Sequence, residues 1–268
     1  GAGARLQVRH LFLHGGQGLQ HRVQQLGSQL LHDLASDIRH DALDLLDLRQ
    51  YERVLGSRNA LLKSARQQAV DPQMFEVYEV LLARHGASIV RRRQRVLAEF
   101  VPRVREVFAA IAAPGLRADV RYEVRGGTSA DLEGALLAAL RDRRDRDRLL
   151  GYTTRGPHRD ELDLLLDERP AQLHASQGQA RALVLACKIA EIRSLEATLG
   201  ESPVLLLDDV SSELDAERNR ALMQHLGELG GQVFVTTTDP AYIRVRGERQ
   251  VAQIEAGRVI RDVLAGDA

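Results

Sequence analysis

The sequence predicts an α/β fold in which a sheet of strands and helices is joined to a mostly helical lobe. From residue 151 onward, short apolar runs alternate with helical runs, which is the pattern of a largely parallel sheet. Between residues 43 and 113, apolar residues instead recur with helical spacing. We therefore expect a poorly patterned N-terminal remnant over 1–48, a helical lobe over 49–150 and a C-terminal lobe over 151–268.

Composition narrows the class of protein without naming a partner. The 268 residues are 44% hydrophobic, enough to bury a sizeable core, and 37 basic residues balance 37 acidic ones. The single cysteine, Cys187, excludes a disulfide within the chain and is expected to be an inert core residue. No apolar run is long enough to cross a bilayer, and no signal peptide is visible. We expect a cytoplasmic protein, and a first residue other than methionine fits a truncated or processed chain.

Residues 1–48 carry the weakest pattern. Residues 11–13 resemble a strand that enters a glycine turn at residues 14–18. This turn lacks the lysine and hydroxyl residue of a phosphate-binding loop. Five histidines fall in the segment, but without a cysteine or ordered carboxylate nearby they indicate surface positions rather than a metal site.

The helical lobe is predicted from two long patterns. Leucines and Tyr51 form an apolar stripe over 43–68. Asp71 followed by Pro72 predicts the start of a second helix, which continues to residue 113 and ends at Pro114 and Gly115. The arginines at 91–93 and 95 could contact a DNA backbone, but a solvated helix face is favoured.

The next segment mixes both patterns. Residues 120–124 alternate like a strand, and residues 132–150 are expected to form one helix. Arginine and aspartate alternate over 141–148, which predicts ion pairs along an exposed helix. A hairpin is expected from a strand at 162–166, a turn at 167–170 and a return strand at 171–174.

The alternating pattern of the C-terminal part predicts a sheet whose strands are joined by helices. We expect a helix over 180–199, a buried strand over 204–207, a helix over 215–229 and a strand over 232–236. Two short strands near 251–254 and 259–264 complete the chain. In such sheets ligands bind at the carboxyl ends of the strands.

Two motifs of this part carry chemistry. Ser176, Gln177, Gly178 and Gln179 begin a helix, where unpaired amides and the helix dipole favour phosphate oxygens. Asp208 and Asp209 follow an apolar strand, and such carboxylates suit a magnesium ion and an attacking water. Taken singly, each motif has a plainer interpretation, as an ordinary helix cap and as a solvated acidic pair.

The other half of a nucleotide site has no counterpart in these residues. A phosphate-binding loop needs lysine directly after glycine, in the pattern G-x-x-x-x-G-K-[ST]. The chain has two lysines, and Lys63 follows leucine while Lys188 follows cysteine. A nucleotide site would need that loop from elsewhere, or the chain is a piece of a longer protein.

Four stretches in this order resemble the RecF family of bacterial recombination mediators, within the ABC-type ATPases that include the SMC proteins. They are YERVLGSRNALLK at 51–63, GYTTRGPHRDEL at 151–162, ASQGQARALVLACKIAE at 175–191 and PVLLLDDVSSELD at 203–215, with support from QVFVTTTD at 232–239. The resemblance covers residues 49–268. It implies an ABC-type P-loop NTPase-like sheet with a helical lobe, lacking the N-terminal phosphate-loop segment.

The resemblance also implies roles for single residues. Ser176, Gln177, Gly178 and Gln179 match the signature motif, which contacts the γ-phosphate of ATP held by the opposite subunit. Asp208 matches the position that holds Mg²⁺, and Asp209 matches the residue that polarises the attacking water. The loop that contains Ser212 and Asp215 matches one that crosses the dimer interface. Thr238 falls where many relatives carry a switch histidine, and Gly156, Pro157, His158 and Arg159 match a family motif of unassigned role.

As a whole, the resemblance implies a DNA replication and repair protein. Such a protein binds single-stranded and duplex DNA at ends or gaps as an ATP-dependent homodimer. It works with other recombination mediator proteins in gap repair and the SOS response. The family is a slow DNA-dependent ATPase, so enzymatic activity stays open for a chain without the phosphate loop. The alternatives are a catalytically inactive DNA-binding or regulatory chain, and a different magnesium-dependent hydrolase that leaves the Ser176 motif unexplained.

Overall fold

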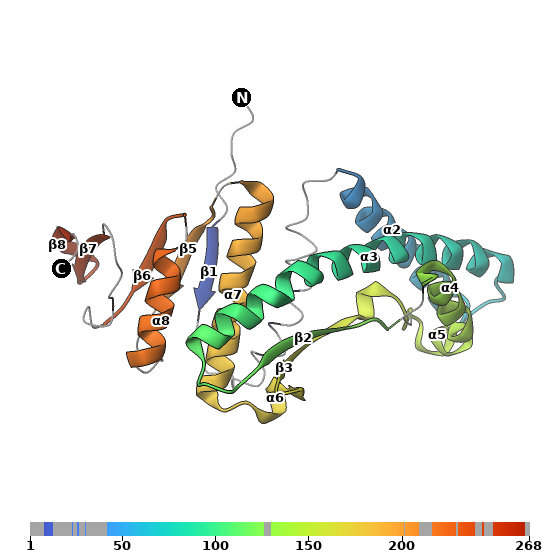
Figure 1. Ribbon diagram of the computed structural model, residues 1–268. Coiled ribbons are helices and arrows are strands. Elements are labelled where there is room, and N and C mark those ends of the chain that lie inside the picture. The colour runs from blue at the N-terminus through green and yellow to red at the C-terminus, as the bar shows by residue number, and fades with distance from the viewer. Residues whose placement is uncertain are drawn as a thin grey trace. The chain divides into compact units, whose positions relative to one another are not determined.

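The computed structural model describes residues 8–12, 23, 26, 30, 42–125, 130–200, 202–208, 216–228, 230–238, 243 and 249–265 (Figure 1). The chain divides into two compact units. The sheet unit comprises residues 1–19, 103–118 and 175–268, and the helical unit comprises residues 20–102 and 119–174. The units therefore divide the chain at positions other than residue 150, because residues 151–174 lie in the helical unit.

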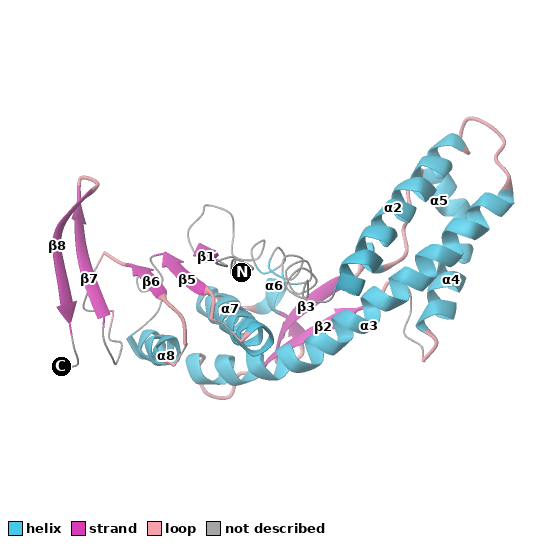
Figure 2. Ribbon diagram, turned by 90° about the horizontal axis from the view of Figure 1, so that it is seen from above, coloured by secondary structure: helices cyan, strands magenta, loops and turns pink. Residues whose placement is uncertain are grey.

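The sheet unit contains a three-stranded parallel sheet in the order β1-β5-β6. Its strands are β1 (Val8–Phe12), β5 (Val204–Asp208) and β6 (Val233–Thr236). The helices α7 (Gln177–Leu199) and α8 (Ala216–Gly227) lie beside these strands (Figure 2). An antiparallel hairpin of β7 (Arg249–Glu255) and β8 (Arg258–Ala265) belongs to the same unit. The strands and helices expected after residue 175 are confirmed, as is a strand close to residues 11–13.

The core of the sheet unit is built from the apolar run of β5 and from α7. Leu205 and Leu207 of β5 are 3% and 2% exposed. Along α7, Leu183 and Cys187 are fully buried. Burial raises the pKa of the Cys187 thiol to about 12, so the sulfur is held as a neutral, unreactive thiol. The expectation of an inert core cysteine is confirmed.

Four of the described helices and a second small sheet make up most of the helical unit. The helices are α2 (Ala42–Ser64), the part of α3 (Pro72–Ile111) up to residue 102, α4 (Leu132–Asp142) and α5 (Arg144–Leu150). The sheet has the order β2-β3-β4, with β2 (Ala118–Glu123), β3 (Glu161–Leu166) and β4 (Arg169–Pro170). A 3₁₀ turn, η1 (Pro157–Arg159), precedes β3. The predicted start of α3 is confirmed, and Asp71 Oδ1 accepts a hydrogen bond of 2.9 Å from the Gln73 amide.

Two predicted elements are wrong in detail. The helix expected over 132–150 is broken at Arg143, which has φ −93° and ψ 0° and separates α4 from α5. The return strand expected at 171–174 is instead the short helix α6 (Ala171–His174), and β3 pairs with β4, which lies inside the expected turn. Asp167 and Glu168 both have positive φ, so they form a tight two-residue turn in place of the four-residue turn that was expected.

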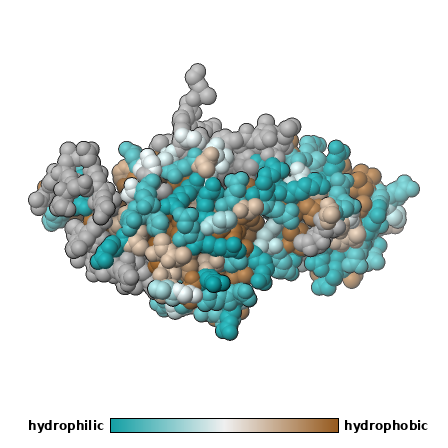
Figure 3. Space-filling model, in the orientation of Figure 1, coloured by the Kyte–Doolittle hydropathy of each residue, from teal (hydrophilic) through white to brown (hydrophobic). Residues whose placement is uncertain are grey.

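Two apolar clusters hold the helical unit together. One cluster contains Tyr51, Val54, Leu82, Ile89 and Leu140, and the other contains Ala83, Ala87, Val90, Val124, Leu132 and Leu136. A Cβ built on Gly86 of α3 would lie 3.3 Å from both Tyr51 and Pro157, so α3 approaches α2 closely there. Teal hydrophilic groups cover much of the visible surface, with brown apolar groups near α4 (Figure 3).

Candidate nucleotide site and a polar core in the helical unit

The motif at 176–179 begins α7, as predicted. Ser176 is the N-cap, with φ −65° and ψ 164°. Its Oγ accepts a hydrogen bond of 3.3 Å from the Gln179 amide, and its own amide donates to Gln179 Oε1 at 2.8 Å. This reciprocal pair is a capping box. Ser176 is therefore an ordinary helix cap. Because its Oγ only accepts in this contact, the hydroxyl proton stays available to a ligand.

The cap lies on the surface of the sheet unit. Ser176 and Gln177 are exposed, and Gly178 and Gln179 are half-buried. The first amides of a helix have no partner within it, and α7 is 23 residues long, so its positive dipole end is well developed. An anion can therefore reach this helix start without a rearrangement of the core.

The strand-end carboxylates are described only in part. Asp208 is the last residue of β5, and its Cα lies in register with Phe12 of β1 and Thr236 of β6. All three positions are at the carboxyl edge of the parallel sheet, where α/β proteins bind ligands. Thr238 follows this edge and is exposed. The side chain of Asp208 and the residues Asp209, Ser212 and Asp215 lie outside the described part of the chain.

No group of three histidine, cysteine, aspartate or glutamate side chains in the described residues could hold a metal ion. The side chains of Asp208 and Asp209 are not among the described residues, so this result does not bear on them. The Mg²⁺ role expected for Asp208 therefore stays a prediction.

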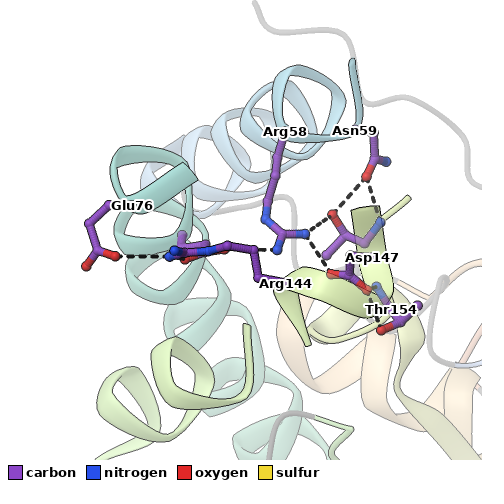
Figure 4. Close-up of polar contacts among 8 residues, drawn as sticks. Arg58, Asn59, Glu76, Arg144, Asp147 and Thr154 are labelled. Atoms are coloured by element: carbon purple, nitrogen blue, oxygen red, sulfur yellow. Dashed lines mark hydrogen bonds and ion pairs between the residues drawn. The ribbon is translucent and has the colours of Figure 1, made fainter. Parts of the chain in front are cut away.

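A buried polar network that was not predicted occupies the helical unit (Figure 4). Arg58 of α2 is fully buried and donates to Glu79 of α3 at 3.0 Å and to Asp147 of α5 at 2.8 Å. Its Nη1 also donates to Thr153 Oγ1 at 2.8 Å. Burying a charge is costly unless it is paired and hydrogen-bonded, and here three separate elements supply the partners.

Arg144 of α5 completes the balance of charge. It forms ion pairs with Glu76, at 3.1 Å, and with Glu79, both on α3. The hydrogen bonds from the Arg144 side chain hold its own pKa above the ordinary arginine value. The prediction that the Arg-Asp block pairs along one exposed helix is therefore wrong for Arg144 and Asp147, although Arg143 does pair with Asp142 at 3.3 Å. Asp147 is fully buried, and both it and Arg144 pair with other helices, which accounts for the break in the helix at Arg143.

The same network fixes the start of the loop that joins α5 to β3. Asn59 Oδ1 accepts from both the amide and the hydroxyl of Thr153, each at 2.8 Å. Asp147 Oδ1 accepts from the Thr154 hydroxyl at 2.6 Å and from the Thr154 amide at 3.1 Å. The backbone at 153–154 is thus tied to α2 and α5 at the same time.

The motif Gly156, Pro157, His158 and Arg159 is the second half of this loop. Gly156 has φ +123°, and a Cβ on it would overlap the hydroxyl of Tyr51. His158 Nε2 lies 3.1 Å from the Thr153 carbonyl oxygen, so this nitrogen carries the proton. The Tyr51 hydroxyl then donates to Nδ1 of a neutral imidazole at 2.6 Å. Burial lowers the pKa of His158, in agreement with that neutral state.

Arg93 and Asp160 anchor the end of the loop. Arg93 donates to the Pro157 carbonyl at 2.6 Å and lies 3.6 Å from Asp160. The Tyr122 hydroxyl and the Arg125 amide also donate to Asp160, yet burial keeps the pKa of this carboxyl above its ordinary value. Arg91 and Arg95 are exposed, as expected for a solvated face, but the half-buried Arg93 is a loop anchor.

Comparison with known proteins places these features in a family. The chain is 45% identical over 221 residues to the DNA replication and repair protein RecF of Anaeromyxobacter sp. strain Fw109-5, a match that covers 80% of this chain and 58% of that protein. Over this stretch the chain belongs to the RecF family. Eight RecF proteins that match the chain are each covered over 52% to 60% of their length. No family model matches the chain.

Solved structures agree with the sequence comparison. A RecF structure described as RecF-ATP in the RecFOR pathway has a TM-score of 0.74 at 26% identity, over 88% of this chain and 63% of that one. The Smc head domain of Pyrococcus furiosus has a TM-score of 0.50 at 12% identity, over 97% of this chain and 61% of that one, which bears on the fold alone. The fold is thus that of RecF and SMC ATPase heads, the ABC-type class, as predicted.

None of the helices in the described residues combines the length and the apolar character that a bilayer span requires.

Proposed function

We propose that this chain acts in DNA replication and repair as RecF does, binding single-stranded and duplex DNA within an ATP-dependent dimer. The observation that carries the proposal is the exposed capping box at Ser176, in a chain that is 45% identical to a RecF protein. A structure of a RecF protein with ATP supports a nucleotide as the ligand. Because the chain spans 58% of that relative, the activity of a whole RecF protein is itself part of the proposal.

The helix start supplies the groups that an ATP-bridged dimer needs. Ser176 Oγ already accepts from the Gln179 amide, so the hydroxyl proton is free to donate to a γ-phosphate oxygen of the neighbouring subunit. The first amides of α7 and its dipole favour the same negative charge. Exposure of Ser176 and Gln177 lets a second subunit approach.

The sheet edge would supply the hydrolytic groups. Asp208 would hold Mg²⁺ and Asp209 would orient the attacking water, while Ser212 and Asp215 would lie at the dimer interface and Thr238 close to the γ-phosphate. A bound Mg²⁺ would neutralise the charge that develops on the phosphates. Closing the dimer around ATP would favour the DNA-bound state, and hydrolysis would release it.

A mixing experiment tests the signature role. The chain is added to an intact RecF protein whose own signature serine is replaced by arginine, and ATP turnover is measured in the presence of DNA. We expect the added chain to restore one composite site, and Ser176→Arg to abolish that restoration. Thr198→Arg, at the exposed opposite end of α7, is the matched control and should restore turnover normally. Equal restoration by Ser176→Arg would contradict the role given to Ser176.

A second candidate function follows from the missing phosphate loop. The 268 residues contain no G-x-x-x-x-G-K-[ST] segment, which favours a DNA-binding or regulatory chain without its own ATPase activity. In either case we expect no ATP turnover from the chain alone. Turnover that disappears in Asp209→Asn would refute this. An upstream reading frame that encodes the segment would favour the ATPase.

The proposal extends to the role of the protein in the cell. We expect the chain, in its full-length form, to support gap repair and the SOS response together with other recombination mediator proteins. The measurement is survival after ultraviolet damage in a strain that lacks its own RecF. Full rescue by an Asp208→Asn variant would contradict a role for the metal site.

A further inference from the structure

Two cations of the helical unit lie next to the turn that ends α5. Lys63 is in the last turn of α2, Arg66 follows that helix, and both are exposed. A Cβ built on Gly151 would lie 3.4 Å from Nη1 of Arg66 and 3.6 Å from Cγ of Lys63. Within the described residues neither side chain forms an ion pair. Their charges are therefore not neutralised by the protein there.

A third cation, Arg159, lies over the ring of Tyr152, the residue that follows Gly151. The guanidinium carbon of Arg159 is 5.1 Å from the centre of the Tyr152 ring. Tyr152 is 40% exposed, and Arg159 is exposed as well. Arg159 likewise has no carboxylate partner in the part of the chain that the structure describes. Lys63, Arg66, Tyr152 and Arg159 together form what we call the basic loop surface.

The buried contacts keep this surface in place. Thr153 and Thr154 are bound to Asn59 and Asp147 directly after Tyr152. His158, directly before Arg159, is held by Tyr51 and by the Thr153 carbonyl. A side chain that is already positioned loses less entropy when it binds a partner. The polar core therefore pre-organises two of the four groups.

Four other cations of the same unit are neutralised by carboxylates. Arg58, Arg125, Arg141 and Arg144 each pair with a carboxylate. The chain as a whole has no net charge, with 37 basic and 37 acidic residues. The basic loop surface differs from these four residues, because its three cations have no carboxylate partner among the described residues and one of them, Arg159, lies over an exposed aromatic ring. Unpaired lysine and arginine next to an aromatic ring are the groups with which proteins bind nucleic-acid backbones.

We propose that the basic loop surface binds backbone phosphates of DNA, which gives the motif at residues 156–159 its role. This inference rests on the proposed function, because it locates the DNA contact of a protein already proposed to bind DNA. Lys63, Arg66 and Arg159 contact phosphates, and the ring of Tyr152 holds the guanidinium of Arg159 in position. The contact does not read sequence, because phosphates are the same at every base.

The salt dependence of DNA binding tests this. Binding of a fluorescent duplex is measured by anisotropy from low to high salt, for the wild type and for Lys63→Gln/Arg66→Gln/Arg159→Gln. Each phosphate contact contributes about 0.9 to the slope of log K against log salt, so we expect the triple variant to lose about 2.7 in slope. Each lost contact should weaken binding about eightfold at ~0.1 M salt.

Two further variants separate charge from structure. Arg91→Gln/Arg95→Gln/Arg169→Gln removes three exposed cations of the same unit and should keep the wild-type slope. Lys63→Arg/Arg66→Lys/Arg159→Lys keeps the three positive charges, so this variant should also keep the wild-type slope. Because all of these side chains are exposed, the thermal midpoints should agree among the variants.

The outcomes are distinguishable. Wild-type binding with an unchanged slope in the first triple variant overturns the basic loop surface and leaves the proposed function standing. An equal loss of slope in the variant Arg91→Gln/Arg95→Gln/Arg169→Gln overturns it too. Binding would then depend on the total positive charge and not on the position of these residues. Absence of any DNA binding by the wild-type chain overturns both this inference and the DNA-binding part of the proposed function.

Discussion

At the scale of single residues, Arg58 determines how the helical unit packs. Its guanidinium is fully buried and connects α2 to carboxylates on α3 and α5. Glu79 and Asp147 are buried with it, and the partly exposed Arg144 brings the set to two positive and two negative charges. A neutral set of paired charges of this kind is tolerated in a core, whereas the same set with one member removed is not.

We therefore expect Arg58→Ala to lower the free energy of unfolding by about 3–5 kcal/mol, because the buried Asp147 loses its arginine partner and Glu79 loses one of two. Chemical denaturation followed by circular dichroism measures the change. Arg53→Ala, at an exposed position of the same helix, is the matched control and should stay within about 0.5 kcal/mol of wild type. A small effect of Arg58→Ala would mean that the carboxylates find other partners.

His158 gives the helical unit a dependence on pH. Burial lowers its pKa from the ordinary value of 6.5. Below that value the unfolded chain binds a proton that the folded chain does not, so stability falls as the pH drops. His158→Gln cannot titrate, and we expect its stability to fall less between pH 7 and pH 5. The comparison of denaturation midpoints across that range measures this, and parallel curves would contradict it.

At the scale of elements, the loop between α5 and β3 depends on one glycine. A side chain on Gly156 would meet the Tyr51 hydroxyl and would have to adopt φ +123°. We expect Gly156→Ala to destabilise the protein by more than about 1–3 kcal/mol, because the steric overlap adds to the backbone strain. In a Tyr51→Phe background, where the hydroxyl is absent, the same substitution should cost less. Equal costs in the two backgrounds, measured by thermal denaturation, would place the effect in the backbone alone.

Elements with local signals were predictable from sequence, and those fixed by distant contacts were not. Asp71 and Ser176 are side chains that cap the next turn of their own chain, so the starts of α3 and α7 could be expected. The break at Arg143 depends on carboxylates of α3 that lie far away in sequence. The helix at α6 was missed because the turn at Asp167 and Glu168 needs positive φ at residues without a glycine.

At the scale of the whole molecule, alternation of strands and helices predicted the class of fold but not the division into units. Helix α3 runs for 40 residues as one pattern, yet its residues beyond 102 belong to the sheet unit. Similarly, β1 belongs to the poorly patterned segment 1–48, and its partner β5 (Val204–Asp208) lies far along the chain. Pairing across such a distance leaves no periodic trace in the sequence.

Part of the candidate site was predictable from sequence, as was part of the fold. A serine before an apolar helix and an apolar strand before two aspartates are local patterns, and the structure describes the first in full. The polar core around Arg58 carries no such pattern, because a buried arginine and an exposed one look alike in a helix. Its nearest signal was the Arg-Asp alternation over 141–148, which was assigned to the wrong partners.

The burial of the one thiol makes the chain its own probe of conformation. Cys187 is fully enclosed, and its pKa of about 12 leaves almost no thiolate at neutral pH. A thiol reagent can therefore modify the chain only after α7 has come away from its surroundings. The rate of alkylation would report how often the sheet unit opens, with no engineered label and a single site to count.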